Sequence, residues 1–395
     1  MRLLFSITYY TPYSSGLTLY VKRLAERLGR KNIDCTVMCM QHQKNLSLQE
    51  NINGVKIVRA KPLLSISKGF ISLDWIIKSL KFTLSSDVIF LNLPQFEAIF
   101  PAIFGKLFQK KVISIYHCEP VLPEGVMNKI IQGVLYLSNL LSLLLSDRVI
   151  TYTKDFAESS KLLSYVRNKV KTQYPPIVEP KIDKRVQNII REKIGKKADF
   201  IIGVAARLAA EKGIEYLLEA IPLLEEKIKT PAFAEASAGR QNSKLKIIIA
   251  GSMKPVGEEH YKQKILRLVE QNKEYVAFLG ELSEEEMGSF YSLLDVLVLP
   301  SVNSTEAFGM VQVEAMMTGV PVVATDLPGV RVPVQKTGMG KIVPIKNSRK
   351  LAEAIIEVLS NTEKFTRNAE IAKKEFSIDR CLTFYIKSVI KNLSS

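Results

Sequence analysis

The chain has 395 residues, is 47% hydrophobic and carries a formal net charge of +16. This length exceeds one typical hydrophobic core and the composition shows no disorder bias, so two packed domains are expected. Four scattered cysteines form no C-x-x-C pair, which excludes a disulfide scaffold or cysteine metal site and indicates a reduced, intracellular protein.

The first half alternates apolar, β-branched runs with amphipathic helical stretches, a pattern typical of a doubly wound parallel sheet. The expected strands are 2–8, 35–40, 55–60, 87–92, 111–116 and 148–152. The helices expected between them are 17–30, 71–84, 96–108, 126–145 and 154–165. We assign residues 1–177 to this first Rossmann-like domain.

A proline-rich segment at 174–183, YPPIVEPKID, ends this alternation because it cannot continue a helix or a central strand. Residues 178–375 form a second Rossmann-like domain, and 376–395 carry a helical pattern expected to pack back on the first. The segment 230–243 lacks useful periodicity and is expected to be a surface insertion outside the core. The strands expected in the second domain are 200–206, 244–251, 275–280, 295–300 and 320–325.

The excess positive charge lies mainly in the first half, where residues 1–175 hold 23 Lys and Arg against 11 Asp and Glu. The N-terminal run MRLLFSITYY predicts a first strand and not a signal peptide, and no segment has the ~18 uninterrupted apolar residues of a membrane span. Residues 62–84 combine apolar and lysine side chains, and 126–145 are strongly apolar. These two segments suit docking at an anionic membrane, with core helices whose lysines face water as the alternative.

Two cations follow the strand at 200–206 in the loop ARLAAEKG. Arg207 and Lys212 precede Gly213 and an amphipathic stretch, so side-chain charges and a helix N-terminus are expected to favour a diphosphate there. Two solvated charges in an ordinary loop are the alternative.

The segment 295–326 contains a strand, a loop, a helix and a strand, which is one turn of a parallel α/β sheet. Loops at the carboxyl ends of such strands are where ligands bind. We expect Ser304 or Thr305 to cap a helix that starts near Phe308, and Gly309 to let a ligand approach the backbone.

Two acids belong to this same segment. Glu306 is expected in the loop facing the cleft and Glu314 on the body of the helix, with two unrelated surface acids as the alternative.

In the first domain, two features follow strands. The loop YYTPYSSG at 9–16 ends in Ser14, Ser15 and Gly16, whose amides suit a phosphate but whose residue types are also good turn formers. His117 follows the strand at 111–116, where it is positioned to bind a sugar or phosphate, or to serve as a loop histidine with no function.

The pattern PS-x4-E-x-FGM-x3-EAMMTGVPVVAT at 300–325 resembles the signature of GT-B glycosyltransferases of the GT4 family. ARLAAEKG is similar to that family's G-R-x4-KG loop, and the resemblance spans nearly the whole chain. It implies a GT-B fold, with two Rossmann-like domains facing each other across a cleft. It also implies retaining transfer of a hexose-type sugar from a UDP- or GDP-linked donor to a hydroxyl acceptor.

The resemblance also implies roles for particular residues. Arg207 and Lys212 would bind the donor diphosphate, and Glu314 the ribose. The transferred sugar and phosphate would be held by Glu306 and the amides of Phe308, Gly309, Met310 and Val311, with Gly16 and His117 approaching from the opposite domain. Of these, His117, Arg207, Lys212 and Glu306 are expected to take part in catalysis. Ser15 departs from the Gly-Gly pair common in the family's first loop, and AGSMKP at 250–255 lacks the usual second glycine.

No cofactor and no metal are expected, because the sequence holds no D-x-D and its three histidines have no partners at ligand spacing. The expected partners are a nucleotide-sugar donor and a glycan or lipid-linked acceptor in polysaccharide, glycolipid or cell-envelope synthesis. The expected location is the cytoplasm, with peripheral docking at the inner face of the membrane. The alternatives are a GT-B nucleotide-sugar epimerase and a nucleic-acid-binding protein. The second is disfavoured because no helix-turn-helix, RNP, KH or zinc spacing is present, and no nucleic-acid partner is expected. The absence of G-x-G-x-x-G after the candidate strands disfavours a redox enzyme.

Overall fold

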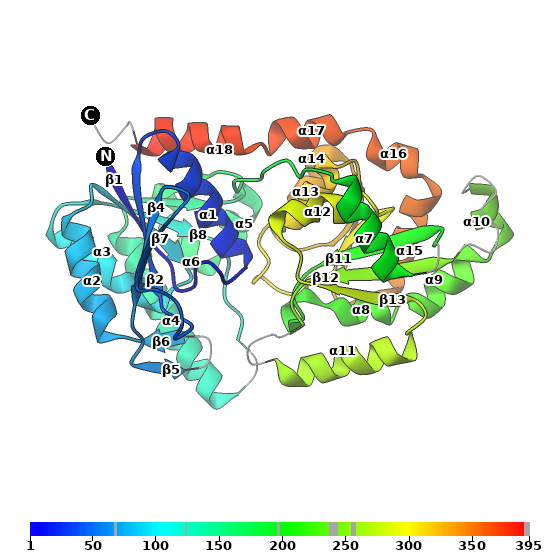
Figure 1. The fold of residues 1–395 in the computed structure, drawn as a ribbon, viewed down its shortest axis with the longest axis horizontal. Coiled ribbons are helices and arrows are strands. Elements are labelled where there is room, and N and C mark those ends of the chain that lie inside the picture. The colour runs from blue at the N-terminus through cyan, green and yellow to red at the C-terminus, as the bar shows by residue number, and fades with distance from the viewer. Residues whose placement is uncertain (67–68, 123–124, 196–197, 237–243, 254–257, 391–395) are drawn as a thin grey trace. The chain divides into compact units, whose positions relative to one another are not determined.

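The chain folds into two compact α/β units, each built on a parallel sheet (Figure 1). The first comprises Met1–Pro176 together with the segment from Ile378 onward, and the second is Ile177–Ser377. The change from one unit to the other falls within the proline-rich segment 174–183. This computed structural model describes residues 1–66, 69–122, 125–195, 198–236, 244–253 and 258–390.

The first unit contains an eight-stranded sheet in the order β10-β9-β8-β7-β1-β2-β4-β3. Every pair is parallel except β3 with β4. Its strands are β1 (Arg2–Ser6), β2 (Asp34–Met40), β3 (Gln49–Ile52), β4 (Val55–Ala60), β7 (Val88–Leu93), β8 (Lys111–Tyr116), β9 (Arg148–Thr151) and β10 (Val170–Thr172). The expected strands are present, whereas β3, β10 and the hairpin of β5 (Leu64–Ile66) and β6 (Gly69–Ile71) were not expected.

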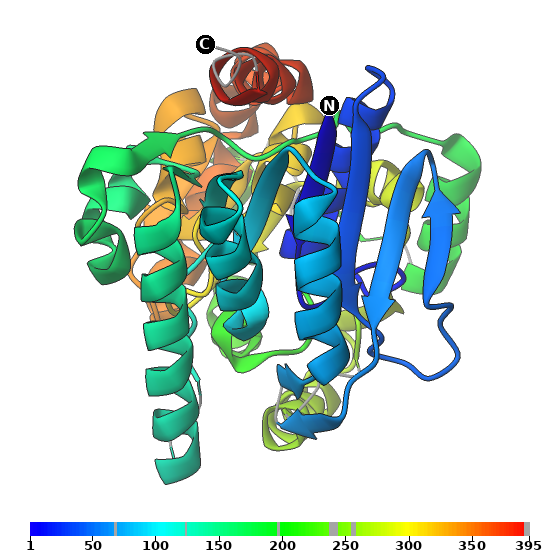
Figure 2. The same ribbon diagram turned by 90° about the vertical axis from the view of Figure 1, so that its left-hand side faces the viewer.

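Helices cover both faces of this sheet, which is why β7, in its middle, is buried at every residue. Figure 2 shows α2, α3 and α4 side by side on one face, with α1 behind the sheet. The helices are α1 (Gly16–Gly29), α2 (Leu73–Leu84), η1 (Phe96–Ala98), α3 (Ile99–Leu107), α4 (Val126–Leu145), α5 (Lys154–Ser159), α6 (Lys161–Ser164), η2 (Arg167–Lys169), α18 (Ile378–Phe384) and the π-helical η4 (Tyr385–Ile390).

Two predicted helices differ in their bounds. The helix predicted at 154–165 is broken at Ser160, whose backbone is extended and whose hydroxyl accepts from Leu163 N at 3.2 Å to cap α6. The helix predicted at 71–84 starts at Leu73, because Ile71 ends β6 and the Ser72 hydroxyl caps α2.

The C-terminal segment packs within the first unit. Tyr385 is buried, and its hydroxyl lies 2.6 Å from that of Tyr20 on α1. The Tyr20 ring in turn meets the His117 imidazole edge-on, with 4.8 Å between ring centroids. Residues from both ends of the sequence therefore complete one core.

The second unit contains a six-stranded parallel sheet in the order β13-β12-β11-β14-β15-β16. Its strands are β11 (Phe200–Ala205), β12 (Leu245–Ala250), β13 (Val276–Gly280), β14 (Val296–Leu299), β15 (Val322–Thr325) and β16 (Gly340–Val343), of which only β16 was not expected. Its helices are α7 (Lys184–Ile194), η3 (Ala210–Lys212), α8 (Ile214–Leu218), α9 (Ile221–Ile228), α10 (Pro231–Ala236), α11 (Glu259–Gln271), α12 (Glu284–Tyr291), α13 (Met310–Met317), α14 (Arg331–Thr337), α15 (Ser348–Ser360), α16 (Thr362–Thr366) and α17 (Ala369–Glu375).

The prediction of a surface insertion at 230–243 was wrong for its first part. Residues 231–236 form α10, and Phe233 packs into the core with its ring 5.4 Å from that of Phe200. Alanine-rich sequence with one aromatic suffices for a single helical turn that buries that ring. Residues 237–243 lie outside the described part of the chain.

Candidate active site

Two loops meet at one edge of the second sheet, because β11 and β14 are neighbouring parallel strands and end on the same side. Val302 N, after β14, donates to the carbonyl oxygen of Glu211, after β11, at 3.0 Å. Gly213 has a left-handed φ of 61°, and a Cβ there would lie 2.2 Å from the Pro300 carbonyl oxygen. Only glycine permits this close approach.

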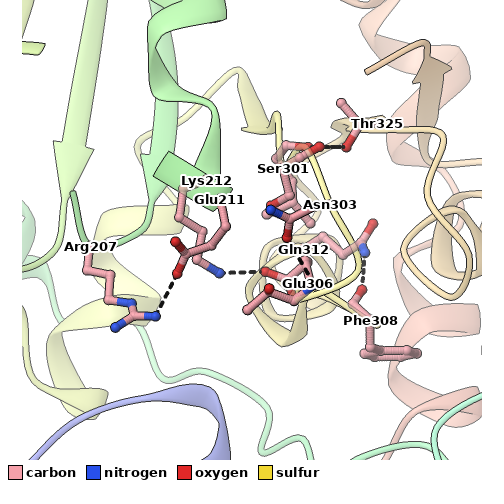
Figure 3. A network of polar contacts seen from close by, with 11 residues as sticks. Arg207, Glu211, Lys212, Ser301, Asn303, Glu306, Phe308, Gln312 and Thr325 are labelled. Carbon is pink, nitrogen blue, oxygen red and sulfur yellow. Dashed lines mark hydrogen bonds and ion pairs between the residues drawn. The ribbon is translucent and has the colours of Figure 1, made fainter. Parts of the chain in front are cut away.

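These loops bring together Lys212 and Glu306, which are 94 residues apart in the sequence. Lys212 Nζ lies 2.7 Å from Glu306 Oε2, and the two side chains are only 20% and 15% exposed (Figure 3). Arg207 forms a second pair, with its Nη2 2.7 Å from Glu211 Oε1. Both predicted cations thus stand at one sheet edge, each already beside an acid.

Glu211 was not singled out from the sequence, although it belongs to the quoted loop. Its position four residues after Arg207 did not reveal the contact, because Arg207 precedes the η3 turn, which starts only at Ala210 after the extended residue Ala209.

The predicted cap of the helix after Glu306 was wrong. Neither Ser304 nor Thr305 caps it, and α13 begins at Met310 with Gly309 as its N-cap in a left-handed conformation, φ 75°. The cause lies upstream, where Asn303 Oδ1 accepts from Thr305 N at 3.0 Å and forms a turn before any helix starts.

Gly309 is also required by packing. A Cβ there would lie 2.4 Å from Leu299 Cδ2, so the loop would have to shift. The role expected for Gly309 as a point of close ligand approach stays a prediction.

The first turn of α13 is held rigidly. Gln312 Nε2 donates to the carbonyl oxygens of Phe308 and of Val330, the latter at 3.0 Å. The Phe308 ring is buried against Phe376, with 5.9 Å between centroids. Met310 and Val311 open the helix, and their amides have no acceptor within it. The backbone of this segment can therefore serve an anion, whereas the Phe308 side chain belongs to the core.

Glu314 lies on the buried face of α13 and is 6% exposed. Its Oε2 accepts from the hydroxyl of Tyr291, on α12, at 2.8 Å. This bond fixes the direction of the carboxylate. No spacing in the sequence pointed to Tyr291, because it comes from a different helix.

The helix expected behind Gly213 is shorter than its sequence pattern. It divides into α8, of five residues, and α9. The first amide of α8, Ile214 N, donates to the Tyr261 hydroxyl at 3.0 Å, and that hydroxyl donates to Glu215 Oε2 at 2.6 Å. The contribution that this helix N-terminus was expected to make to diphosphate binding is thus reduced, because its first N–H group already donates to Tyr261.

In the first unit, His117 directly follows β8, as expected, and is fully buried. Its Nε2 lies 3.0 Å from Asn92 Oδ1, and its Nδ1 contacts the Tyr152 hydroxyl. Burial lowers the pKa of the His117 imidazole from 6.5 to about 3, so the ring is neutral at pH 7. Asn92 Nδ2 donates to Ser6 O, which leaves its Oδ1 to accept from His117 Nε2–H, so Nδ1 accepts from Tyr152.

Gly16 is the first residue of α1, and Ser15 is its N-cap. The Ser15 hydroxyl accepts from Thr18 N at 3.2 Å. Ser15, which replaces the first glycine of the Gly-Gly pair common in the GT4 family, therefore stabilises the start of α1 as its N-cap.

A buried polar cluster beside these residues was not found from the sequence. Ser6 Oγ donates to Gln95 Oε1 at 2.8 Å, Gln95 N donates to Asn139 Oδ1 at 3.1 Å, and Thr8 Oγ1 donates to Glu97 Oε2 at 3.3 Å. Burial raises the pKa of the Glu97 carboxyl from 4.5 to about 7. Single polar residues between apolar ones gave no pattern for detecting this network.

Within the described residues, no group of three or more His, Cys, Asp or Glu side chains is arranged to hold a metal ion. The four cysteines are free thiols and all are buried, as expected for a chain without a disulfide framework.

Residues 186–375, which make up most of the second unit, match the family model for glycosyl transferases group 1. An uncharacterized glycosyltransferase of Methanocaldococcus jannaschii is 24% identical over 100% of this chain and 99% of that protein. D-inositol 3-phosphate glycosyltransferase of Corynebacterium urealyticum is 30% identical over 44% of this chain and 38% of that protein.

Among solved structures, Anabaena HepE in complex with UDP and glucose has a TM-score of 0.77 at 19% identity, covering 99% of this chain and 100% of that one. Sucrose-phosphate synthase from Thermosynechococcus elongatus has a TM-score of 0.71 at 19% identity, covering 99% and 98%. The fold is GT-B. The predicted fold class is confirmed.

The chain is thus similar to proteins named as glycosyltransferases, and the match to the family model lies in the second unit. The matched residues 186–375 include both loops described above, with the Lys212–Glu306 pair and the start of α13.

Proposed function

We propose that this chain is a retaining GT4-type glycosyltransferase that moves a hexose-type sugar from a nucleoside diphosphate sugar to a hydroxyl acceptor. The observation that carries the proposal is the Lys212–Glu306 pair, formed between two loops at one sheet edge just before the first turn of α13. The names of the relatives, and the UDP and glucose in the HepE complex, support this choice of donor.

The site in the second unit is suited to a diphosphate leaving group. As the bond between the anomeric carbon and the phosphate oxygen breaks, negative charge grows on the phosphate. Lys212, Arg207 and the amides of Met310 and Val311 would stabilise that charge where it develops. The cations can then take the place of a metal, and metal independence is part of the proposal.

The acceptor oxygen forms the new bond to the anomeric carbon. In the retaining reaction its proton passes to the departing phosphate oxygen, so atoms and charge balance without an enzymic nucleophile. Glu306 holds Lys212 in place before the donor binds, and its carboxylate is suited to accept from a sugar hydroxyl. Glu314, oriented by Tyr291, is assigned to the ribose hydroxyls.

The roles of His117 and Gly16 stay predictions. Each follows a strand of the first unit at its carboxyl end, β8 and β1 respectively. For His117 to bind a sugar directly, it would have to exchange a bond to Asn92 or Tyr152.

For the acceptor we propose a glycan or lipid-linked hydroxyl of envelope or glycolipid synthesis, reached from the cytoplasm. Alpha-monoglucosyldiacylglycerol synthase of Acholeplasma laidlawii, 27% identical over 51% of this chain and 48% of that protein, is one relative that supports this acceptor class.

The test is a donor screen with the full chain. Thermal unfolding is followed with UDP, GDP and their hexose conjugates, since a donor that binds the folded state raises its melting temperature. Release of nucleoside diphosphate and appearance of a glycosylated acceptor are then measured with the stabilising donor. Conversion of the donor sugar to its epimer without transfer would favour the epimerase, and no stabilisation by any nucleotide would refute the proposal.

A further inference from the structure

Helix α4 turns its polar side chains toward the protein and its apolar side chains outward. Its buried residues include Ser138, Asn139 and Ser142, and Asn139 accepts from Gln95 N while Ser138 Oγ donates to Phe96 O at 2.6 Å. The surface helix of a water-exposed domain normally has the opposite arrangement. The outward side therefore matches an apolar environment.

The exposed apolar residues of α4 recur every three or four positions, which places them in one stripe. Neighbouring α2 and α3, packed beside α4 on the same face of the sheet, extend it (Figure 2). We call this surface the apolar face. It consists of Leu73, Ile77, Leu80 and Leu84 on α2, Ile103 and Leu107 on α3, and Val126, Met127, Ile130, Val134, Leu137, Leu141 and Leu144 on α4.

The apolar face has a basic surround. The segments 73–84, 99–111 and 126–148, which form these helices and their C-terminal ends, hold seven Lys and Arg and only two Asp. Both acids are engaged in ion pairs, Asp74 with Lys78 and Asp147 with Lys106. The net charge around the apolar side chains is therefore positive.

We propose that the apolar face docks on the surface of an anionic membrane, with α4 lying in the interface. An extended apolar surface bordered by lysines fits acyl chains beneath anionic headgroups, and each lysine near the surface adds attraction. Among the described helices, α4 is the one long and apolar enough to cross a bilayer by length and composition alone. The hydrogen bonds of Asn139 and Ser138 hold α4 to the first unit. We therefore place α4 on the membrane surface and not across the bilayer.

This inference goes beyond the proposed function and does not depend on it, because none of its residues belongs to the nucleotide site. If both hold, the enzyme works at the surface where lipid-linked hydroxyls are concentrated.

The test is flotation of the full chain with vesicles of phosphatidylglycerol and phosphatidylcholine, compared with pure phosphatidylcholine, at low and high salt. The test variant is the double substitution Ile130→Glu with Leu137→Glu, on exposed positions of α4. The matched control is Ile189→Glu with Ile371→Glu, which changes two similarly exposed apolar residues of the second unit. Circular dichroism confirms that each variant is folded.

We expect wild type and control to bind anionic vesicles at low salt, and the α4 variant to bind at least about tenfold more weakly. Absence of binding by wild type, or equal binding by the α4 variant, would overturn the proposal. Equal binding to neutral vesicles would overturn its electrostatic part. If the wild-type protein binds no vesicles but forms a dimer, and the α4 variant is a monomer, the apolar face is an interface with a second copy of the chain and the membrane proposal is overturned. Nucleotide-dependent thermal stabilisation, measured on the same samples, separates failure of docking from failure of the proposed function.

Discussion

The substitution Glu97→Gln should make the stability of the first unit depend strongly on pH. Glu97 is buried, and its pKa of about 7 in the folded protein lies above the 4.5 of an exposed carboxyl. The folded state thus holds this proton more tightly than the unfolded chain. Its contribution to stability is complete below pH 4.5 and is lost as pH rises through 7, a total of about 3 kcal/mol at ~1.4 kcal/mol per pKa unit.

His117 acts with the opposite sign. Its pKa is about 3 when folded and 6.5 when unfolded, because burial disfavours the charged ring. Its contribution is complete above pH 6.5 and is lost as pH falls toward 3. Between pH 4.5 and 6.5 the two slopes cancel in wild type. In Glu97→Gln the His117 slope is no longer opposed, and the free energy of unfolding should rise with pH by about 1.4 kcal/mol per unit more than it does in wild type.

The assay is urea unfolding followed by tryptophan fluorescence at several pH values between 4.5 and 6.5. The chain has one tryptophan, Trp75, and its Nε1 donates to the carbonyl oxygen of Glu97 at 3.0 Å, so the signal reports on this part of the first unit. Glu158→Gln, an exposed acid of α5, is the control and should keep the wild-type profile. If the free energy of unfolding depends on pH in Glu97→Gln as it does in wild type, the protonation states assigned to Glu97 and His117 are wrong.

Four further outcomes test the site. Lys212→Ala should lower turnover by more than about tenfold, the loss of ~2 to 3 kcal/mol of charge stabilisation; an unchanged rate would remove this lysine from the diphosphate site. Tyr291→Phe removes the hydroxyl that orients the buried α13 carboxylate, so KM for the donor should rise several-fold while kcat stays near wild type, and an unchanged KM would argue against the ribose assignment. Gly213→Ala would place a Cβ 2.2 Å from the backbone of the neighbouring loop, whereas Gly338→Ala, in the same left-handed region, would place its Cβ 3.7 Å from Asn368 Nδ2, an ordinary contact. Thermal denaturation should therefore show a loss larger than the ~1 kcal/mol of backbone strain only for Gly213→Ala, and equal losses would contradict the steric argument. Finally, transfer should persist in EDTA, and a loss restored by a divalent cation would contradict metal independence.

Much of the fold was predictable from the sequence, because strands buried on both faces are mostly apolar runs, as in β14 with the sequence VLVL. The strands that escaped prediction are short and partly polar. β3 has the sequence QENI and lies at the sheet edge, where one side needs no apolar cover.

The site was predictable in its residue types but not in its contacts. Lys212 and Glu306 meet because β11 and β14 are neighbours, and strand order is a long-range property that local spacing does not contain. Tyr291 comes from another helix for the same reason. The start of α13 was predicted too early because the Asn303 side chain accepts a hydrogen bond from Thr305 N. This local bond stabilises a turn where the sequence pattern predicted a helix cap.

The pairing of Tyr20 with Tyr385 has a consequence for how the protein is made. The first unit needs a side chain that the ribosome adds only after the entire second unit has been synthesised. Until then Tyr20 lacks the side chain that packs against its hydroxyl in the folded unit, and this hydroxyl is left to bond with water. The half translated first should therefore be the half whose native packing is completed last.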